Sequence, residues 1–229
     1  MASSGLRRGA VPDLKLKDLE KIDKYNLYRI TVYKKEQEQY ITYCTPECAS
    51  QIDRYLQWRA NLGEQIRPNS YLFRLEFDTT SNLHITSPKA YRAETIGHNI
   101  ADLLDRTGIR PRTQTRNIRT SLMACHAFRK FFNTECINHN MNPLYTEYLM
   151  GHKTGLIKSY FKPTDQELLE GNDKSLGYTA MIPYLTINAT EEENNKLRQQ
   201  ITELKESHSK EWELMRQQVT EIKKKMGFT

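Results

Sequence analysis

A histidine and a tyrosine stand eight residues apart in the stretch LMGHKTGLIKSYFKP, residues 149–163. The phenol of Tyr160 is a candidate nucleophile, because its oxygen can form a covalent bond to a substrate. A phenol with a pKa of about 10 reacts poorly at neutral pH, so it needs activating neighbours, and His152 is one candidate. Tyr145 and Tyr148 in the preceding stretch PLYTEYLM are rival phenols, for which a packing role is the favoured interpretation.

An arginine interrupts an apolar stripe in TRNIRTSLMACHAFRKFFNTECINH, residues 115–139. At about 100° per residue, one helix face carries Ile118, Leu122, Cys125, Phe132 and Cys136. Arg129 falls within that stripe, and His126 lies one turn before it. A buried guanidinium is costly unless an anion meets it. Arg129 therefore indicates either a structural pair with a buried carboxylate or a site for a phosphate, which arginine can grip with two N–H groups.

Further arginines lead into the same helix, and no acidic residue stands between Asp105 and Glu135. The lead-in RPRTQTRNIRTS contains Arg110, Arg112, Arg116 and Arg119. Arginines at the start of a helix favour anion binding, because the helix presents free N–H groups there. Their repeated spacing suits a nucleic-acid backbone, so we expect these four residues to contact DNA phosphates.

These stretches resemble the tyrosine recombinases, the phage-integrase family. CHAFRKFF is similar to the family's His-x-x-Arg box, and LMGHKTGLIKSY is similar to its closing Gly-His and nucleophilic tyrosine. SGLRRGAVPDLKLKDL is similar to the box that carries the family's first arginine. The stretch EQYITYCTPECASQIDRYL looks most like integrases from archaea. The resemblance to the family spans residues 5 to about 165.

The resemblance implies six catalytic residues: Arg7, Lys34, His126, Arg129, His152 and Tyr160. Arg7, Arg129 and His152 would hold the non-bridging oxygens of a DNA phosphate in the transition state. Tyr160 would attack the phosphorus and form a 3′-phosphotyrosine. Lys34 would protonate the departing 5′ oxygen, with His126 assisting proton transfer. No cofactor and no metal are implied, because the bond energy is kept in the phosphotyrosine.

The implied function is a site-specific DNA recombinase, or integrase, that acts on double-stranded DNA as a homo-oligomer, a tetramer in the synaptic complex. Two alternatives stay open: a type IB topoisomerase, which shares the tyrosine chemistry, and a catalytically idle DNA-binding or assembly remnant. The chain departs from the family pattern at Ala10, where an acid is usual, and in its short His-to-Tyr interval. The family's amino-terminal DNA-clamping domain has no counterpart in these residues.

The helices and strands that must position these residues can be predicted from the sequence. They indicate an α+β, mostly helical catalytic domain, residues 1–186, with a small antiparallel sheet near the N-terminus. A strand is expected at 14–17, and a hairpin at 27–33 and 39–44, where β-branched and aromatic residues dominate. Strand alternation would then place Lys34 on the face of Ile30 and Val32. Helices are expected from Thr45 to Gly63, then at 88–107 with Ser87 as cap, and at 115–139, 143–150, 154–161 and 164–170.

Residues 190–229 differ from this body. Thr190 and Glu193 form a capping box, and the apolar positions that follow keep heptad spacing with one stutter: Leu197, Ile201, Leu204, His208, Trp212, Met215, Val219, Ile222 and Met226. The pattern predicts one long C-terminal helix. A coiled coil that pairs two chains is favoured over a helix that docks on its own body.

The composition agrees with a nucleic-acid partner. The formal net charge of the 229 residues is +6, and acidic and basic residues balance in 190–229, so the excess lies in the body. No apolar run of about 18 residues predicts a membrane span, and the absence of a signal-peptide pattern points to the cytoplasm. No metal site is expected from Cys125-His126 and Cys136-His139, because the two pairs would lie about 16 Å apart on one helix.

Overall fold

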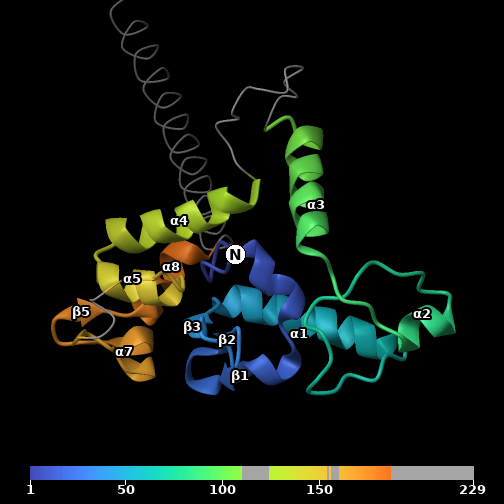
Figure 1. Cartoon of the computed structure of the whole chain (residues 1–229), viewed down its shortest axis with the longest axis horizontal. Coiled ribbons are helices and arrows are strands. Elements are labelled where there is room, and N and C mark those ends of the chain that lie inside the picture. Colours follow the sequence, from blue (N-terminus) through green and yellow to red (C-terminus); the bar gives the residue numbers. More distant parts are fainter. Residues whose placement is uncertain (110–123, 154, 156–159, 187–229) are drawn as a thin grey trace, which may run out of the picture. The chain divides into compact units, whose positions relative to one another are not determined.

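The computed structural model describes residues 1–109, 124–153, 155 and 160–186. All of them belong to the first of the chain's two units, Met1–Thr186. The described part is α+β and rich in helices, with a small antiparallel sheet (Figure 1). The predicted DNA-contacting arginines at 110–119 and the predicted C-terminal helix lie outside the described residues.

The main sheet contains three antiparallel strands in the order β1 (Leu19–Ile22), β2 (Leu27–Val32) and β3 (Tyr40–Tyr43). The predicted hairpin is confirmed, with Ile30 opposite Thr42. The prediction of a strand at 14–17 is wrong. The backbones of Leu14 and Leu16 form hydrogen bonds with those of Leu72 and Ser70, and the chain then enters a 3₁₀ turn at 16–18.

Lys34 does not continue the face of Ile30 and Val32, as alternation predicted. The strand ends at Val32, and Tyr33 has a left-handed backbone with φ of +52°. Because Tyr33 leaves the extended conformation, the two-residue period stops there. The ammonium of Lys34 donates to the carbonyl of Lys17 at 3.2 Å and lies 3.9 Å from the Asp18 carboxylate.

The first half of the chain continues through three helices: α1 (Pro46–Asn61), α2 (Asn82–Thr86) and α3 (Ala93–Arg106). Thr45 caps α1, as predicted, by accepting a hydrogen bond from the Cys48 amide. The helix expected at 88–107 begins only at Ala93, with Arg92 rather than Ser87 at the cap position. The backbone of Lys89 accepts from Leu75 and Ala90 bridges Arg74, so this stretch is held extended by a distant segment.

The described elements of the second half are helices and a short hairpin (Figure 1): α4 (Ala124–Asn138), α5 (Pro143–Leu149), α7 (Asp165–Glu170), β4 (Gly171–Asn172), β5 (Ser175–Leu176) and α8 (Tyr178–Leu185). The helices predicted at 143–150 and 164–170 are confirmed. Their apolar faces bury Phe132, Leu149 and Met181 in one core cluster. A second cluster, with Leu6, Ile30 and Ile52, joins the N-terminal segment, the sheet and α1.

A buried ionic triad fixes the end of α1. The Glu64 carboxylate accepts from the Arg59 Nε at 3.0 Å and from the Arg74 Nη1 at 2.6 Å. All three side chains are at most 2% exposed. Arg59 also donates to the carbonyl of Leu72 and Arg74 to that of Ile85, so the triad holds the 64–85 segment against α1.

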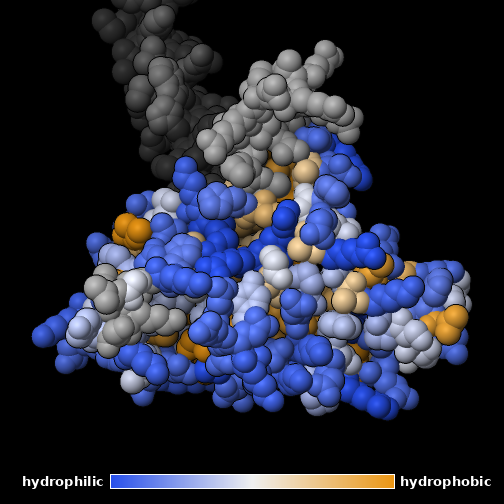
Figure 2. Space-filling view, in the orientation of Figure 1, coloured by the Kyte–Doolittle hydropathy of each residue, from blue (hydrophilic) through white to orange (hydrophobic). Residues whose placement is uncertain are grey.

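Hydrophilic residues dominate the face drawn in Figure 2, in line with a mean hydropathy of −0.75. Among the described helices, none combines the length and apolarity that a membrane crossing needs.

Candidate active site

Two arginines from distant segments converge on one turn of the chain. Arg7 precedes the 3₁₀ helix η1 (Arg8–Asp13), and its Nη2 donates to the carbonyl of Gly151 at 2.6 Å. Arg129, from α4, donates through Nη1 to the carbonyl of Gly5 and through Nη2 to that of Met150 at 3.2 Å. Arg7 thus binds the backbone of the turn that precedes His152, and Arg129 binds both this turn and the segment that precedes Arg7.

Both glycines at this crossing are required by its geometry. Gly5 and Gly151 have φ of +60° and +66°, in the left-handed region that favours glycine. A Cβ at Gly5 would lie 2.8 Å from the Phe132 ring, and one at Gly151 would lie 2.5 Å from the Tyr40 ring. The sequence thus allows the two backbones to approach close enough for both guanidinium groups to reach them.

His152 joins the same cluster. Its Nε2 lies 2.8 Å from Nη2 of Arg129, and its Nδ1 lies 2.6 Å from the Glu147 carboxylate. Because a guanidinium only donates, Nε2 must accept, and the proton resides on Nδ1 and points at Glu147. The structure therefore places Arg7, Arg129 and His152, three of the six predicted catalytic residues, around the turn at 150–152.

The charge of this cluster is unbalanced. Within the described part of the chain, no carboxylate lies within ion-pair distance of Arg7 or Arg129, although Arg129 is only 8% exposed. Among the described residues, carbonyls and His152 take the place of the buried carboxylate that one interpretation of Arg129 expects. Burial lowers the pKa of Arg129; the nearby Tyr40 hydroxyl opposes this effect, and the charge of Arg7 adds to it. Two such guanidinium groups favour an external oxyanion such as phosphate.

The β2–β3 hairpin lies against the same turn. Its residues Glu38 and Tyr40 contact Lys153 and Gly151, the first through an ion pair of 2.8 Å. A cavity of about 390 Å³ opens between the hairpin and this turn, and Tyr40, His152 and Lys162 are among the residues that line it. Lys34 lies on this hairpin, but among the described residues its contacts are with Lys17 and Asp18 and not with the arginines.

The remaining predicted residues are exposed. Tyr160 is 88% exposed, and His126 on α4 is exposed as well. Within the described part of the chain, no hydrogen bond joins either of them to the two arginines. Their side chains are accordingly open to a ligand from solvent.

The rival phenols have structural partners. Tyr145 is 1% exposed and accepts a hydrogen bond from Asn172 at 3.1 Å, and the hydroxyl of Tyr148 donates to the carbonyl of Phe161. Burial raises the pKa of both phenols, which makes them poorer nucleophiles at neutral pH. Their predicted packing role agrees with these contacts.

Sequence reasoning missed two residues of the cluster, Glu147 and Tyr40. Glu147 stands five residues before His152, a spacing that spans the end of α5 and gives no helical signal. Tyr40 opens a strand and looks like any aromatic strand residue. Its unusual feature is that its ring lies against Gly151, a glycine with positive φ that stands 111 positions later. This proximity comes from the tertiary structure alone.

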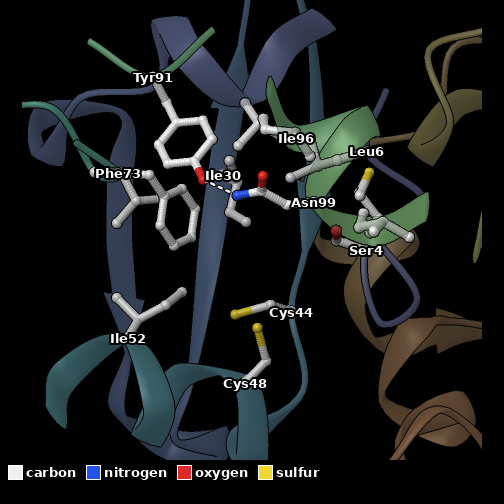
Figure 3. A pocket seen from close by; sticks show the side chains of 14 residues that line it. Ser4, Leu6, Ile30, Cys44, Cys48, Ile52, Phe73, Tyr91, Ile96 and Asn99 are labelled. Atoms are coloured by element: carbon white, nitrogen blue, oxygen red, sulfur yellow. Dashed lines mark hydrogen bonds between the residues drawn. The ribbon is translucent and has the colours of Figure 1, made fainter. Parts of the chain in front are cut away.

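A second, apolar cavity of about 380 Å³ lies apart from this cluster (Figure 3). Leu6, Ile30, Ile52, Phe73 and Ile96 line it, and none of Arg7, Arg129 and His152 does. Figure 3 shows the sulfur atoms of Cys44 and Cys48 facing one another at its edge. Both cysteines are free.

No protein-family model and no curated protein matches the chain. Solved structures that it matches include the XerA recombinase (23% identity, TM-score 0.46), over 73% of this chain and 52% of that one. The XerH site-specific recombinase bound to difH substrate matches at 17% identity and TM-score 0.48, over 69% and 39%. The Tn1549 transposon integrase in complex with transposon right-end DNA matches at 20% and 0.47, over 71% and 52%. The chain thus spans about half or less of these chains, and the functional conclusion rests on its own residues.

Proposed function

We propose that the chain is a site-specific DNA recombinase that cuts and rejoins DNA through a covalent 3′-phosphotyrosine on Tyr160. One observation carries the proposal: Arg7 and Arg129 converge beside His152 without a carboxylate partner in the described part of the chain. Two guanidinium groups in one place suit the two non-bridging oxygens of a phosphodiester.

Each residue has its own role in the proposed reaction. Arg7 and Arg129 neutralise the phosphate, which otherwise repels an approaching phenol oxygen, and they stabilise the extra charge of the transition state. The exposed phenol of Tyr160 attacks phosphorus, and the bond from phosphorus to the 5′ oxygen breaks. His126 assists removal of the phenolic proton, and Lys34 supplies a proton to the departing 5′ oxygen.

Reversal completes the cycle. The 5′ hydroxyl of another strand attacks the phosphotyrosine, and the phenol of Tyr160 leaves, so the number of phosphodiester bonds is conserved. For Lys34 to reach the phosphate, its ammonium must leave the Lys17 carbonyl and Asp18, which hold it on the exposed hairpin turn. Exchange of strands between two duplexes requires several copies of the chain on DNA.

The test uses a pool of nicked duplexes with randomised sequence around the nick, which trap a covalent intermediate because the short cleaved strand diffuses away. We expect a protein–DNA adduct on a denaturing gel. Tyr160→Phe should abolish the adduct and keep DNA binding, whereas Tyr148→Phe, the matched control, should keep both.

An adduct that persists in Tyr160→Phe would overturn the assignment of the nucleophile. Binding without any adduct in the wild type would favour the idle DNA-binding remnant. Duplexes selected through the adduct are then tested for strand exchange, and relaxation of supercoiled DNA without exchange would favour the topoisomerase alternative.

A further inference from the structure

A buried tyrosine hydroxyl whose proton has no acceptor lies beside the arginine pair. Tyr40, the first residue of β3, is 9% exposed, and its hydroxyl proton has no hydrogen-bond acceptor in the described structure. Its ring packs on Gly151 and meets the Tyr33 ring edge to face at 6.2 Å. Burying such a group unpaired is unfavourable, since its hydrogen bonds to water are lost without replacement.

The neighbours of Tyr40 explain why its proton has no acceptor. Arg7 and Arg129 act on its hydroxyl through a backbone N–H and a guanidinium, and both of these groups can only donate. The carbonyls of Gly5, Met150 and Gly151 accept from the arginines instead. Burial raises the pKa of Tyr40 more than the two cations lower it, so the phenol keeps its proton at neutral pH.

We propose that Tyr40 is a third phosphate-binding residue, whose hydroxyl donates a hydrogen bond to a non-bridging oxygen of the phosphodiester held by Arg7 and Arg129. This inference rests on the proposed function. Tyr40 and His152 line the same 390 Å³ cavity, which reaches the histidine beside Arg129, although neither arginine is among its lining residues. The ligand supplies the acceptor that the protein lacks, and the unpaired hydroxyl is a site prepared for it.

Tyr40→Phe separates this role from packing, because it removes only the oxygen. Without an unpaired buried hydroxyl, the variant should unfold at the same or a higher urea concentration than the wild type. Adduct formation with nicked DNA should nevertheless slow about 10- to 100-fold at saturating DNA, the range for a hydrogen bond to a charged group.

Tyr43→Phe is the matched control. Tyr43 lies on the same strand and is 1% exposed, but its hydroxyl already donates to the Asp165 carbonyl at 2.8 Å. This variant should lose stability and keep the adduct rate per folded molecule. Tyr40→Phe with lowered stability and an unchanged adduct rate would overturn the inference.

A binding measurement distinguishes failure of this inference from failure of the proposed function. Orthovanadate, a phosphate-like oxyanion, is titrated by calorimetry into the wild type, Tyr40→Phe and Tyr43→Phe. We expect about 10-fold weaker binding for Tyr40→Phe alone. If no adduct forms with any DNA yet vanadate binding depends on Tyr40, the recombinase proposal fails and the oxyanion site stands. If the adduct forms and both readouts ignore Tyr40→Phe, the inference fails and the recombinase proposal stands.

Discussion

The Nη2 of Arg129 lies 2.8 Å from the Nε2 of His152, and this contact fixes the proton of the ring. Arginine offers no acceptor, so Nε2 accepts and Nδ1–H donates to Glu147 at 2.6 Å. Glu147 thereby orients His152, and His152 orients the guanidinium. The candidate site is a chain of three side chains and not a set of separate catalytic groups.

Removing the acceptor at the end of this chain should slow DNA cleavage. Glu147→Ala leaves the Nδ1 proton of His152 without its partner, and we expect a loss of about 1.5–3 kcal/mol in the barrier for adduct formation. Glu147→Gln keeps an acceptor oxygen and should lose less. Single-turnover adduct formation at saturating DNA measures both, with urea unfolding as the control for stability. Equal rates in all three proteins would remove Glu147 from the site.

Arg129→Lys should have a larger effect. Lysine keeps the charge, but its single nitrogen cannot contact the Gly5 carbonyl, the Met150 carbonyl and His152 together. We expect a loss of about 2.7–4 kcal/mol of transition-state stabilisation, the range for one oxyanion donor. The rate is compared per folded molecule, because the lost carbonyl contacts also lower stability. A Lys variant within threefold of the wild type would contradict a role for the fork.

DNA affinity should depend strongly on salt. The +6 excess lies in the body, and the sequence predicts phosphate contacts from the arginines at 110–119. If about four contacts form, log K should fall against log salt with a slope of about −3.6. Fluorescence anisotropy with a labelled duplex measures it, and Arg112→Ala with Arg116→Ala should bring the slope toward about −1.8. An affinity that does not change with salt would exclude backbone recognition.

The predictable part of the site is local, and the missed part is not. The apolar stripe around Arg129 and the strand pattern at 27–33 depend on residues within a turn or two of each other. The partners of Arg129 and Arg7 lie 124 and 144 positions away, and no periodicity encodes such pairings. The same reason explains the wrong helix start at Ser87, since Leu75 holds Lys89 in extended backbone. The position of Arg129 in an apolar stripe predicts that its guanidinium needs an acceptor, but only the fold identifies backbone carbonyls as the acceptors.

The buried triad should contribute to acid stability. Burial raises the pKa of Glu64, but hydrogen bonds from Arg59 and Arg74 outweigh it and leave the pKa below its usual value. A depressed carboxyl pKa stabilises the fold above the unfolded value of about 4.3, and this stability is lost as pH falls through the folded pKa.

Glu64→Gln removes the charge and leaves two buried guanidinium groups uncompensated. We expect a loss of about 3–5 kcal/mol of unfolding free energy at pH 7. Urea unfolding between pH 3 and pH 7 should show a steeper acid loss for the wild type than for the variant. Parallel curves would mean that Glu64 does not titrate differently in the folded and unfolded states.

The two cysteines at the apolar cavity give a prediction independent of catalysis. A hydrogen bond with Cys44 lowers the pKa of Cys48, because it stabilises the Cys48 thiolate, and the pKa of Cys44 is raised in turn. Cys48 also lies in the first turn of α1, where the helix favours negative charge.

Iodoacetamide should therefore alkylate Cys48 with a pH midpoint below the value of about 8.5 for a free thiol. Cys44→Ala removes the donor and should move the midpoint upward, with mass spectrometry reporting Cys125, which is partly exposed, as the internal reference. A Cys48 midpoint that is the same in both proteins would show that the facing sulfurs share no hydrogen bond.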